Sequence, residues 1–386
     1  MRRTRGKMVR MRMTSWYRRL AVCAAALSFA PASRAVHAQR ASDSSFSALV
    51  ARLSESGGFF DSDNIITNEA SYLSVASQLA KVGVHGGVYI GVGPDQNFSY
   101  IALIHPSMAF MLDVRRDNML EHLLFKSLFA LSRNRFEYLL RLLGKPIPPD
   151  VEAWSDRPIA DILARVNAER VDSQAVLATR RASNEKILKF GVPLTSHDRD
   201  VIERYRSTFV SEGLDTRFSS IGRNNRYDYP SFGRLIMETD RNGKRISYLA
   251  DEAAFQLVRT MQLEDRIVPV VGNVAGDKAV RAIGTYAADH GLKVSAFYLS
   301  NVEQYLMGRD GGFQEYARNV KALPHDASSV IIRSFFGRGA QHPLYVPSSG
   351  NVSTSMIEPI DSFLRAYAAG EITSYSALVF DRYVKP

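Results

Sequence analysis

The chain has 386 residues, of which 46% are apolar and 23% charged, and this is typical of a folded protein with one large or two ordinary domains. Its formal charge of +10 is concentrated in the first 38 residues, which hold nine of the 49 Lys and Arg and no acid, so 40 basic and 39 acidic residues remain. A nearly neutral remainder lacks the basic surface that nucleic acid requires, and we expect no nucleic-acid partner.

Residues 1–38 have the three parts of a cleavable export signal. A basic stretch ends at Arg19, an apolar run extends from Leu20 to Ala30, and small residues around Ala38 offer a cleavage site. Eleven apolar residues are too few to cross a bilayer, which needs about 20. We therefore expect a periplasmic or secreted protein, cleaved near Ala38, with no membrane span in its mature form.

The sequence does not decide between the possible export routes. The sequence around Cys23, the only cysteine, resembles a lipoprotein site poorly. In the other export routes Cys23 is removed with the leader, so the mature protein would have neither a disulfide nor a thiol nucleophile. The run Tyr17-Arg18-Arg19-Leu20 resembles a degenerate twin-arginine signal, which would export a protein already folded around a cytoplasmic cofactor.

The first elements after the leader predict a parallel βαβ unit within residues 39–118. Apolar residues at helical spacing within the polar segment 39–57 indicate a first helix or a tether, and residues 68–81 suit a short helix that ends at Gly83. Residues 88–92 form an apolar, β-rich run between glycines, residues 98–104 suit a helix, and residues 109–113 suit a second buried strand. Two continuous apolar strands joined by a helix are typical of a parallel sheet.

Residues 119–215 predict a mostly helical insertion. The strongest helix covers Met119 to Leu143, with leucines on one face and charged residues that exclude a membrane span. Further helices are predicted at 159–171, 173–181 and 198–210. A polar, aromatic loop follows from Arg217 to Pro230.

Strands and helices alternate again in residues 216–386. Strands are predicted at 268–272, 294–299 and 329–334, with a helix at 277–290 between the first two. The run Ser355-Met356-Ile357-Glu358 suits a capping box for a helix that ends at Gly370. The chain is thus expected to form an α/β, doubly wound and mostly parallel sheet with a helical insertion.

A glycine turn after the first strand is the most informative local feature. Gly91 and Gly93 would let the backbone approach a ligand, with Asp95 and Asn97 in the same loop. Asp113 ends the next strand 22 residues after Gly91, where an acid can accept hydrogen bonds from ribose hydroxyls. A turn with no ligand is the alternative explanation of these glycines.

This turn and acid resemble those of class I methyltransferases, which use S-adenosylmethionine and have a Rossmann-like fold. The resemblance implies that Gly91, Gly93, Asp95, Asn97 and Asp113 surround the cofactor. Tyr89 stands where that family usually has an acid. The segments at 269–273, 281–284 and 298–306 resemble those of an uncharacterised bacterial family with the same methyltransferase-like fold, which implies a fold and no particular reaction.

Polar residues at the ends of the later strands are candidate substrate or catalytic groups. Asn273 follows the strand at 268–272, and Asn301 and Glu303 follow the strand at 294–299. Carboxyl ends of parallel strands line the ligand crevice of such sheets, although Glu303 also suits a helix cap. Arg333, on an apolar strand, suits either a buried ion pair or a substrate clamp.

Three functions remain open at this point. The first is a non-enzymatic protein that binds a small molecule, and the second is an S-adenosylmethionine-dependent methyltransferase that uses Asn273 or Glu303 to orient its substrate. The third is a hydrolase that uses Asp95, Asp113 or Glu303 as a general base. The sequence contains no motif typical of a metal site, a serine-hydrolase elbow or a phosphate-binding loop.

Overall fold

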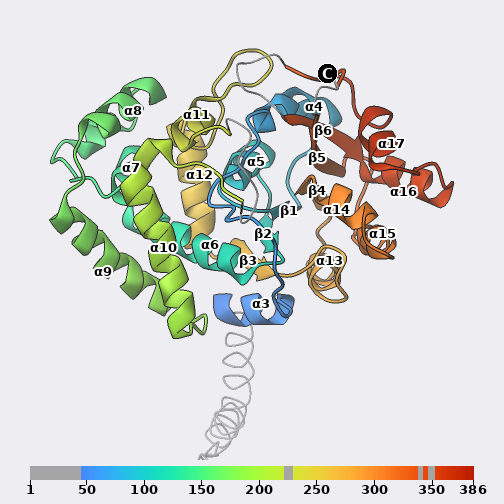
Figure 1. Cartoon of the computed structure of the whole chain (residues 1–386), viewed down its shortest axis with the longest axis horizontal. Coiled ribbons are helices and arrows are strands. Elements are labelled where there is room, and N and C mark those ends of the chain that lie inside the picture. The colour runs from blue at the N-terminus through green and yellow to red at the C-terminus, as the bar shows by residue number, and fades with distance from the viewer. Residues whose placement is uncertain (1–44, 221–228, 338–341, 347–352) are drawn as a thin grey trace, which may run out of the picture.

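A six-stranded sheet forms the centre of the molecule (Figure 1), in a computed structural model that describes residues 45–220, 229–337, 342–346 and 353–386. The strand order is β3-β2-β1-β4-β5-β6. All neighbours run parallel except β5 and β6, which are antiparallel. The strands are β1 (Val88–Val92), β2 (Met108–Asp113), β3 (Ile267–Val271), β4 (Val294–Ser300), β5 (Val330–Phe336) and β6 (Ser353–Pro359). The predicted α/β class with a mostly parallel sheet is therefore confirmed, and the order is that of doubly wound folds.

Helices cover both faces of this sheet, and for that reason its parallel strands are mostly apolar. On one side, α6 packs on β2 and β3, and α12 packs on α5 and α6. On the other side, α3 packs on β3, and α13 contacts both α3 and α15. The strands β1 to β5 are almost fully buried as a result.

The helices include most of those that the sequence predicted and several that it did not, such as α12 and α15. Those in the first half are α3 (Phe46–Leu53), η1 (Tyr72–Val75), α4 (Ala76–Val82), α5 (Gln96–Ile104), α6 (Arg116–Leu131), α7 (Arg135–Leu142), η2 (Val151–Trp154), α8 (Ile159–Ala168), α9 (Ser173–Lys189), α10 (Ser196–Glu212) and η3 (Gly213–Asp215). Those in the second half are α11 (Phe232–Met237), α12 (Glu252–Leu263), α13 (Ala279–Asp289), α14 (Val302–Met307), α15 (Gly312–Lys321), α16 (Ile360–Ala368) and α17 (Tyr375–Phe380).

The long helix predicted over Met119 to Leu143 is wrong in one respect, because it is two helices. The chain leaves the helical conformation after α6, and Asn134 starts α7 by accepting a hydrogen bond from Glu137 N at 2.9 Å. An asparagine is a strong helix start, and the apolar spacing alone did not reveal it.

The capping box predicted at Ser355 to Glu358 is also wrong, since these residues form β6. All seven residues of β6 pair with β5, from Ser353 opposite Phe336 to Pro359 opposite Val330. The helix begins only at Ile360, and Gly370 follows its end with a φ of 70°. Pairing with a buried strand outweighs the local preference for a cap.

The predicted insertion lies on one side of the molecule (Figure 1). Within residues 119–215, α9 and α10 pack on α6, and α6 itself packs on the sheet. The domain boundaries at 118 and 215 stay predictions. The predicted leader, residues 1–38, and the loop segment 221–228 lie outside the described residues. In the described part of the chain, no helix is long and apolar enough to span a membrane.

Candidate functional site

A cavity of about 990 Å³ opens at the carboxyl ends of the parallel strands. Its lining includes the residue that follows β1, the last residue of β2, the two residues that follow β3, and the last residue of β4 with the residue after it. These strand-end residues are Gly93, Asp113, Gly272, Asn273, Ser300 and Asn301. A pocket of this volume suits a drug-sized ligand, and this edge of an open α/β sheet is where ligands bind.

The glycine turn lies against this cavity, and its two glycines act differently. Gly93 has a φ of 88°, a left-handed conformation that side chains rarely adopt, and it lines the cavity. Gly91 lies inside β1, where an added Cβ would overlap Asn97 Oδ1 and lie 2.7 Å from Tyr89 Cε1. Gly91 is thus required for internal packing, and Gly93 shapes the wall of the cavity.

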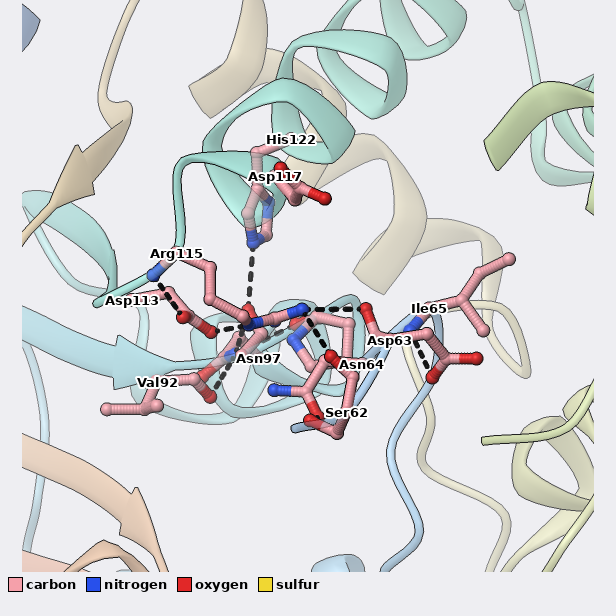
Figure 2. A network of polar contacts seen from close by, with 12 residues as sticks. Ser62, Asp63, Asn64, Ile65, Val92, Asn97, Asp113, Arg115, Asp117 and His122 are labelled. Atoms are coloured by element: carbon pink, nitrogen blue, oxygen red, sulfur yellow. Dashed lines mark hydrogen bonds and ion pairs between the residues drawn. The ribbon is translucent and has the colours of Figure 1, made fainter. Parts of the chain in front are cut away.

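Asn97 holds the turn together from inside (Figure 2). Its Nδ2 donates to the carbonyl oxygens of Val92, Gly93 and Pro94 at 3.1, 3.2 and 2.8 Å. Its Oδ1 accepts the Tyr89 hydroxyl at 2.6 Å, and the residue is fully buried. Asn97 therefore fixes the shape of the loop. The sequence analysis expected it beside a cofactor, but it lies outside the cavity lining.

His122 supports the same turn from α6. Its Nε2 lies 2.9 Å from the Gly93 carbonyl oxygen, and burial lowers the pKa of this histidine to about 4. At neutral pH the ring is therefore uncharged and donates its Nε2 proton to that carbonyl.

Asp113 reaches the cavity and is also part of a buried ion pair (Figure 2). Its Oδ2 lies 3.1 Å from Arg115 Nη2, and its Oδ1 accepts the Arg115 backbone N at 2.8 Å. Arg115 Nη1 also donates to the carbonyl oxygens of Ser62 and Asp63, both at 2.9 Å. Burial would lower the pKa of Arg115, but the Asp113 carboxylate raises it overall, so the guanidinium stays charged.

The same arginine fixes a loop that borders the cavity. Ser62 lines the cavity, and the Asp63 carboxylate accepts the backbone N of Ser219 at 3.0 Å and its hydroxyl at 2.6 Å. Arg115 and Asp63 together therefore link three segments that are far apart in sequence. Nothing in the local pattern of the sequence pointed to Arg115 or Asp63.

Asp95 does not face the large cavity. It borders a small separate pocket between α5 and α11, and its Oδ2 accepts the Tyr248 hydroxyl at 3.1 Å. Burial raises the pKa of Asp95 to about 7. The carboxyl thus belongs to an internal contact with Tyr248.

The three candidates after the later strands are divided between two locations. Asn273 and Asn301 line the cavity. The Glu55 carboxylate accepts the Asn273 backbone N at 2.7 Å and thereby orders the loop after β3. Glu303 is fully buried outside the lining, and α14 has no side-chain cap.

Glu303 belongs to a buried ion-pair network with Arg333. Arg333 Nε lies 2.7 Å from Glu303 Oε2, and its Nη1 lies 2.7 Å from Glu358 Oε2. Of the two roles that the sequence allowed for Arg333, the structure shows the ion pair. Neither Glu303 nor Arg333 reaches the cavity.

Glu69 and Ser300 are the main site residues that the sequence did not suggest. Ser300 ends β4 with a φ of 55°, lines the cavity, and donates its hydroxyl to the buried Glu69 carboxylate. A non-glycine residue held in the left-handed region is strained, and such strain is concentrated at functional sites. Glu69 lies in a segment that sequence periodicity assigned to an ordinary helix.

The lining is aromatic and polar with few charges. Its aromatic residues include Phe60, Phe218, Tyr229, Tyr298, Tyr305 and Phe336. Among the described residues, its charged members are Asp61, Asp113 and Arg309. A search of the same residues for groups of three or more His, Cys, Asp or Glu that could hold a metal ion found none. The cavity thus suits an organic ligand with ring and hydroxyl groups.

Comparisons with other proteins give a family and no activity. No curated protein matches the sequence. A family whose description names no reaction and no cofactor matches residues 64–379, which contain the whole sheet and most of the cavity lining. The chain therefore belongs to the family described as Domain of unknown function (DUF7790).

Proposed function

We propose that this protein binds a ribose-containing small molecule in the cavity, with S-adenosylmethionine as the ligand of first choice. The observation that carries the proposal is the common cavity of the Gly93 turn and the Asp113 carboxylate. The sequence predicted these two features from spacing, and parallel pairing of β1 with β2 brings them to one edge. An acid at this place can accept hydrogen bonds from ribose hydroxyls.

Asp113 keeps the capacity for such bonds despite its partner. Each carboxylate oxygen can accept about two hydrogen bonds, and Arg115 supplies one to each oxygen of Asp113. Arg115 also keeps this carboxylate oriented, because its guanidinium is fixed by the two loop carbonyls at Ser62 and Asp63. A preoriented acceptor loses less entropy when the ligand binds.

The charge of the lining favours a nucleoside over a dinucleotide. Arg309, at the exposed rim, is the single cation among the described lining residues. A pyrophosphate needs several donors or cations, and it would lie close to the Asp113 carboxylate. A sulfonium nucleoside meets no such conflict.

Methyl transfer is the reaction that this ligand would support, because it supplies a methyl group on a positively charged sulfur. For that reaction the chain itself would orient the ribose with Asp113 and shape the pocket with Gly93. Asn273 and Asn301 line the same cavity and would orient an acceptor. The single antiparallel edge strand β6 and the order of the other five strands are compatible with this methyltransferase-like proposal.

The hydrolase hypothesis finds less support. Of its three carboxylates, Asp95 and Glu303 lie outside the cavity lining. Asp113 is in the lining, but both of its carboxylate oxygens already accept hydrogen bonds from Arg115.

The direct test is calorimetric titration of the purified protein with S-adenosylmethionine and S-adenosylhomocysteine. The variant Asp113→Asn should bind both about 10- to 100-fold more weakly, since it loses a charged acceptor for the ribose. It should stay folded, because an asparagine oxygen can still accept from Arg115. Alanine at this position is less informative, since it would leave the buried Arg115 without its partner.

Asp200→Asn, an exposed change on α10, serves as the matched control and should bind like the unchanged protein. If the unchanged protein binds neither compound, the nucleoside proposal is wrong. Mass spectrometry of small molecules that co-purify with the protein from its native compartment would then identify the ligand.

We also propose that the protein is exported and that residues 1–38 are removed. N-terminal sequencing of the protein isolated from the envelope or medium should then begin near Gln39. A mature protein that still begins at a methionine would contradict export by this signal. Because that compartment is not expected to supply S-adenosylmethionine, the proposal further requires that the ligand is loaded before export, as a twin-arginine route allows.

A further inference from the structure

A buried carboxyl, that of Glu69, lies behind the wall of the cavity. Glu69 is fully buried, and its two oxygens accept the hydroxyls of Ser300 and Ser334. Among the described residues, no ion pair includes Glu69. An unpaired buried charge is costly, and for that reason such groups are more often functional than structural.

The groups found to interact with Glu69 are neutral hydroxyls. Phenols approach it from four elements: Tyr298 on β4, Tyr89 on β1, Tyr100 on α5 and Tyr375 on α17. Burial raises the pKa of Glu69, while its hydroxyl partners oppose that shift. The negative charge of its ionised form is therefore balanced by dipoles alone.

Ser300 transmits this charge to the cavity. Its hydroxyl has one proton, which it donates to Glu69, so toward the cavity the oxygen can only accept. A ligand group that lies against Ser300 is consequently favoured if it is a donor or a cation.

The rest of the lining does not cancel the preference for a donor or a cation beside Ser300. The charge of Asp113 is neutralised by Arg115, and Arg309 is exposed at the rim. The aromatic ring of Tyr298 lies next to Ser300 in the same wall, and the face of such a ring attracts cations. The other lining carboxylate, that of Asp61, would attract a cation as well and so does not oppose this preference. The buried carboxyl in contact with this wall is that of Glu69.

We propose that the cavity prefers a positively charged ligand, and that the Glu69 carboxylate, acting through Ser300, attracts the positive charge. The inference rests on the proposed function and narrows it. S-adenosylmethionine, with its sulfonium group, should bind more tightly than S-adenosylhomocysteine, which has the same nucleoside and amino acid but a neutral sulfur.

Calorimetry with these two compounds as probes tests the inference. At pH 8 the unchanged protein should prefer S-adenosylmethionine about tenfold, as expected for one charge pair several ångströms apart. In Glu69→Gln the preference should fall to about twofold or less, with the affinity for S-adenosylhomocysteine retained. Glu185→Gln, an exposed change on α9, is the matched control and should keep the preference.

A second measurement needs no variant and so does not depend on how Glu69→Gln folds. A cation beside Glu69 stabilises its ionised form, so binding of S-adenosylmethionine should release protons at a pH where Glu69 is partly protonated, seen as a dependence of the heat on buffer ionisation. The preference should also decrease as the pH falls, because protonation removes the charge. Asp95 does not line the cavity, so binding there is not expected to change its ionisation.

The outcomes separate this inference from the proposed function. Equal affinity for the two compounds, with no proton release, would overturn the role of Glu69 and leave nucleoside binding standing. The role of Glu69 is likewise overturned if Glu69→Gln folds and keeps the full preference. Absence of binding to either compound would overturn both proposals.

Discussion

Replacing Arg333 by methionine is expected to lower the free energy of unfolding by about 3–5 kcal/mol, the largest effect we predict for a single change. Arg333 is fully buried and holds Glu303 and Glu358 at 2.7 Å each. Burial would lower the pKa of this arginine, but the two carboxylates raise it, so the folded protein depends on the charge. Urea unfolding followed by circular dichroism measures the loss.

The expected loss of stability arises because the Glu303 carboxylate would remain buried without its ion-pair partner. Without Arg333, Glu358 still pairs with Arg382 at 2.7 Å, but Glu303 keeps only the Tyr316 hydroxyl at 2.9 Å. A buried, unpaired glutamate has a raised pKa, and its contribution to stability is present at low pH and lost as the pH rises through that pKa. The variant should therefore lose more stability at pH 8 than at pH 5.

Two further variants identify the cause. Adding Glu303→Gln to Arg333→Met should recover part of the loss, because it removes the unpaired charge. Arg318→Met breaks an exposed ion pair with Glu315 on α15, and it should cost at most about 1 kcal/mol. If Arg333→Met costs no more than Arg318→Met, the network is not the stabilising element that we describe.

Changing Asn97 to aspartate is expected to cause the second largest loss of stability, because it removes the N–H donors that hold the glycine turn. Carbonyl oxygens of Val92 and Pro94 would lose the Nδ2 bond, and each buried unsatisfied carbonyl costs about 1–3 kcal/mol. We expect a total loss of about 2–4 kcal/mol, measured by urea unfolding. Ligand binding should weaken as well, since Gly93 would lose its fixed position in the wall.

The aspartate at this position should show its own pH dependence. It would be buried among carbonyl oxygens, so its pKa in the folded state would lie above the ordinary value of about 3.9. Its stabilising contribution is then present at low pH, where the protonated group can donate one bond, and is lost as the pH rises. The exposed change Asn167→Asp on α8 should lack both effects. A variant at Asn97 with unchanged stability at pH 8 would show that the turn does not need this amide.

The sheet was predictable because its strands are short, continuous apolar runs between turn residues. Strands β1 to β5 lie within a few residues of their predicted ranges, and helices such as α5 and α13 follow their periodicity. The strand β6 was not predictable in this way. Its sequence, Ser353 to Pro359, is polar at several positions and suits a helix cap, and only pairing with β5 makes it a strand.

The candidate site was predictable to the extent that it depends on strand ends. Gly93, Asp113, Asn273 and Asn301 line one cavity, as expected for residues at the carboxyl edge of a parallel sheet. Asn97 is in the expected turn, but its amide points into the turn and not toward a ligand. Spacing along the chain places a residue, whereas the direction of its side chain depends on neighbours that spacing does not reveal.

The sequence by itself determined the α/β class, the parallel βαβ start, and the glycine turn with an acid at the end of the next strand. These are local features, because apolar period and turn residues act over a few positions. Only the tertiary structure decided which polar groups meet. Glu69 and Ser334 are 265 residues apart in the chain, and Asp113 meets Arg115 together with a loop that begins some 50 residues earlier. Such contacts arise from packing of the whole sheet and its helices, and so no local pattern encodes them.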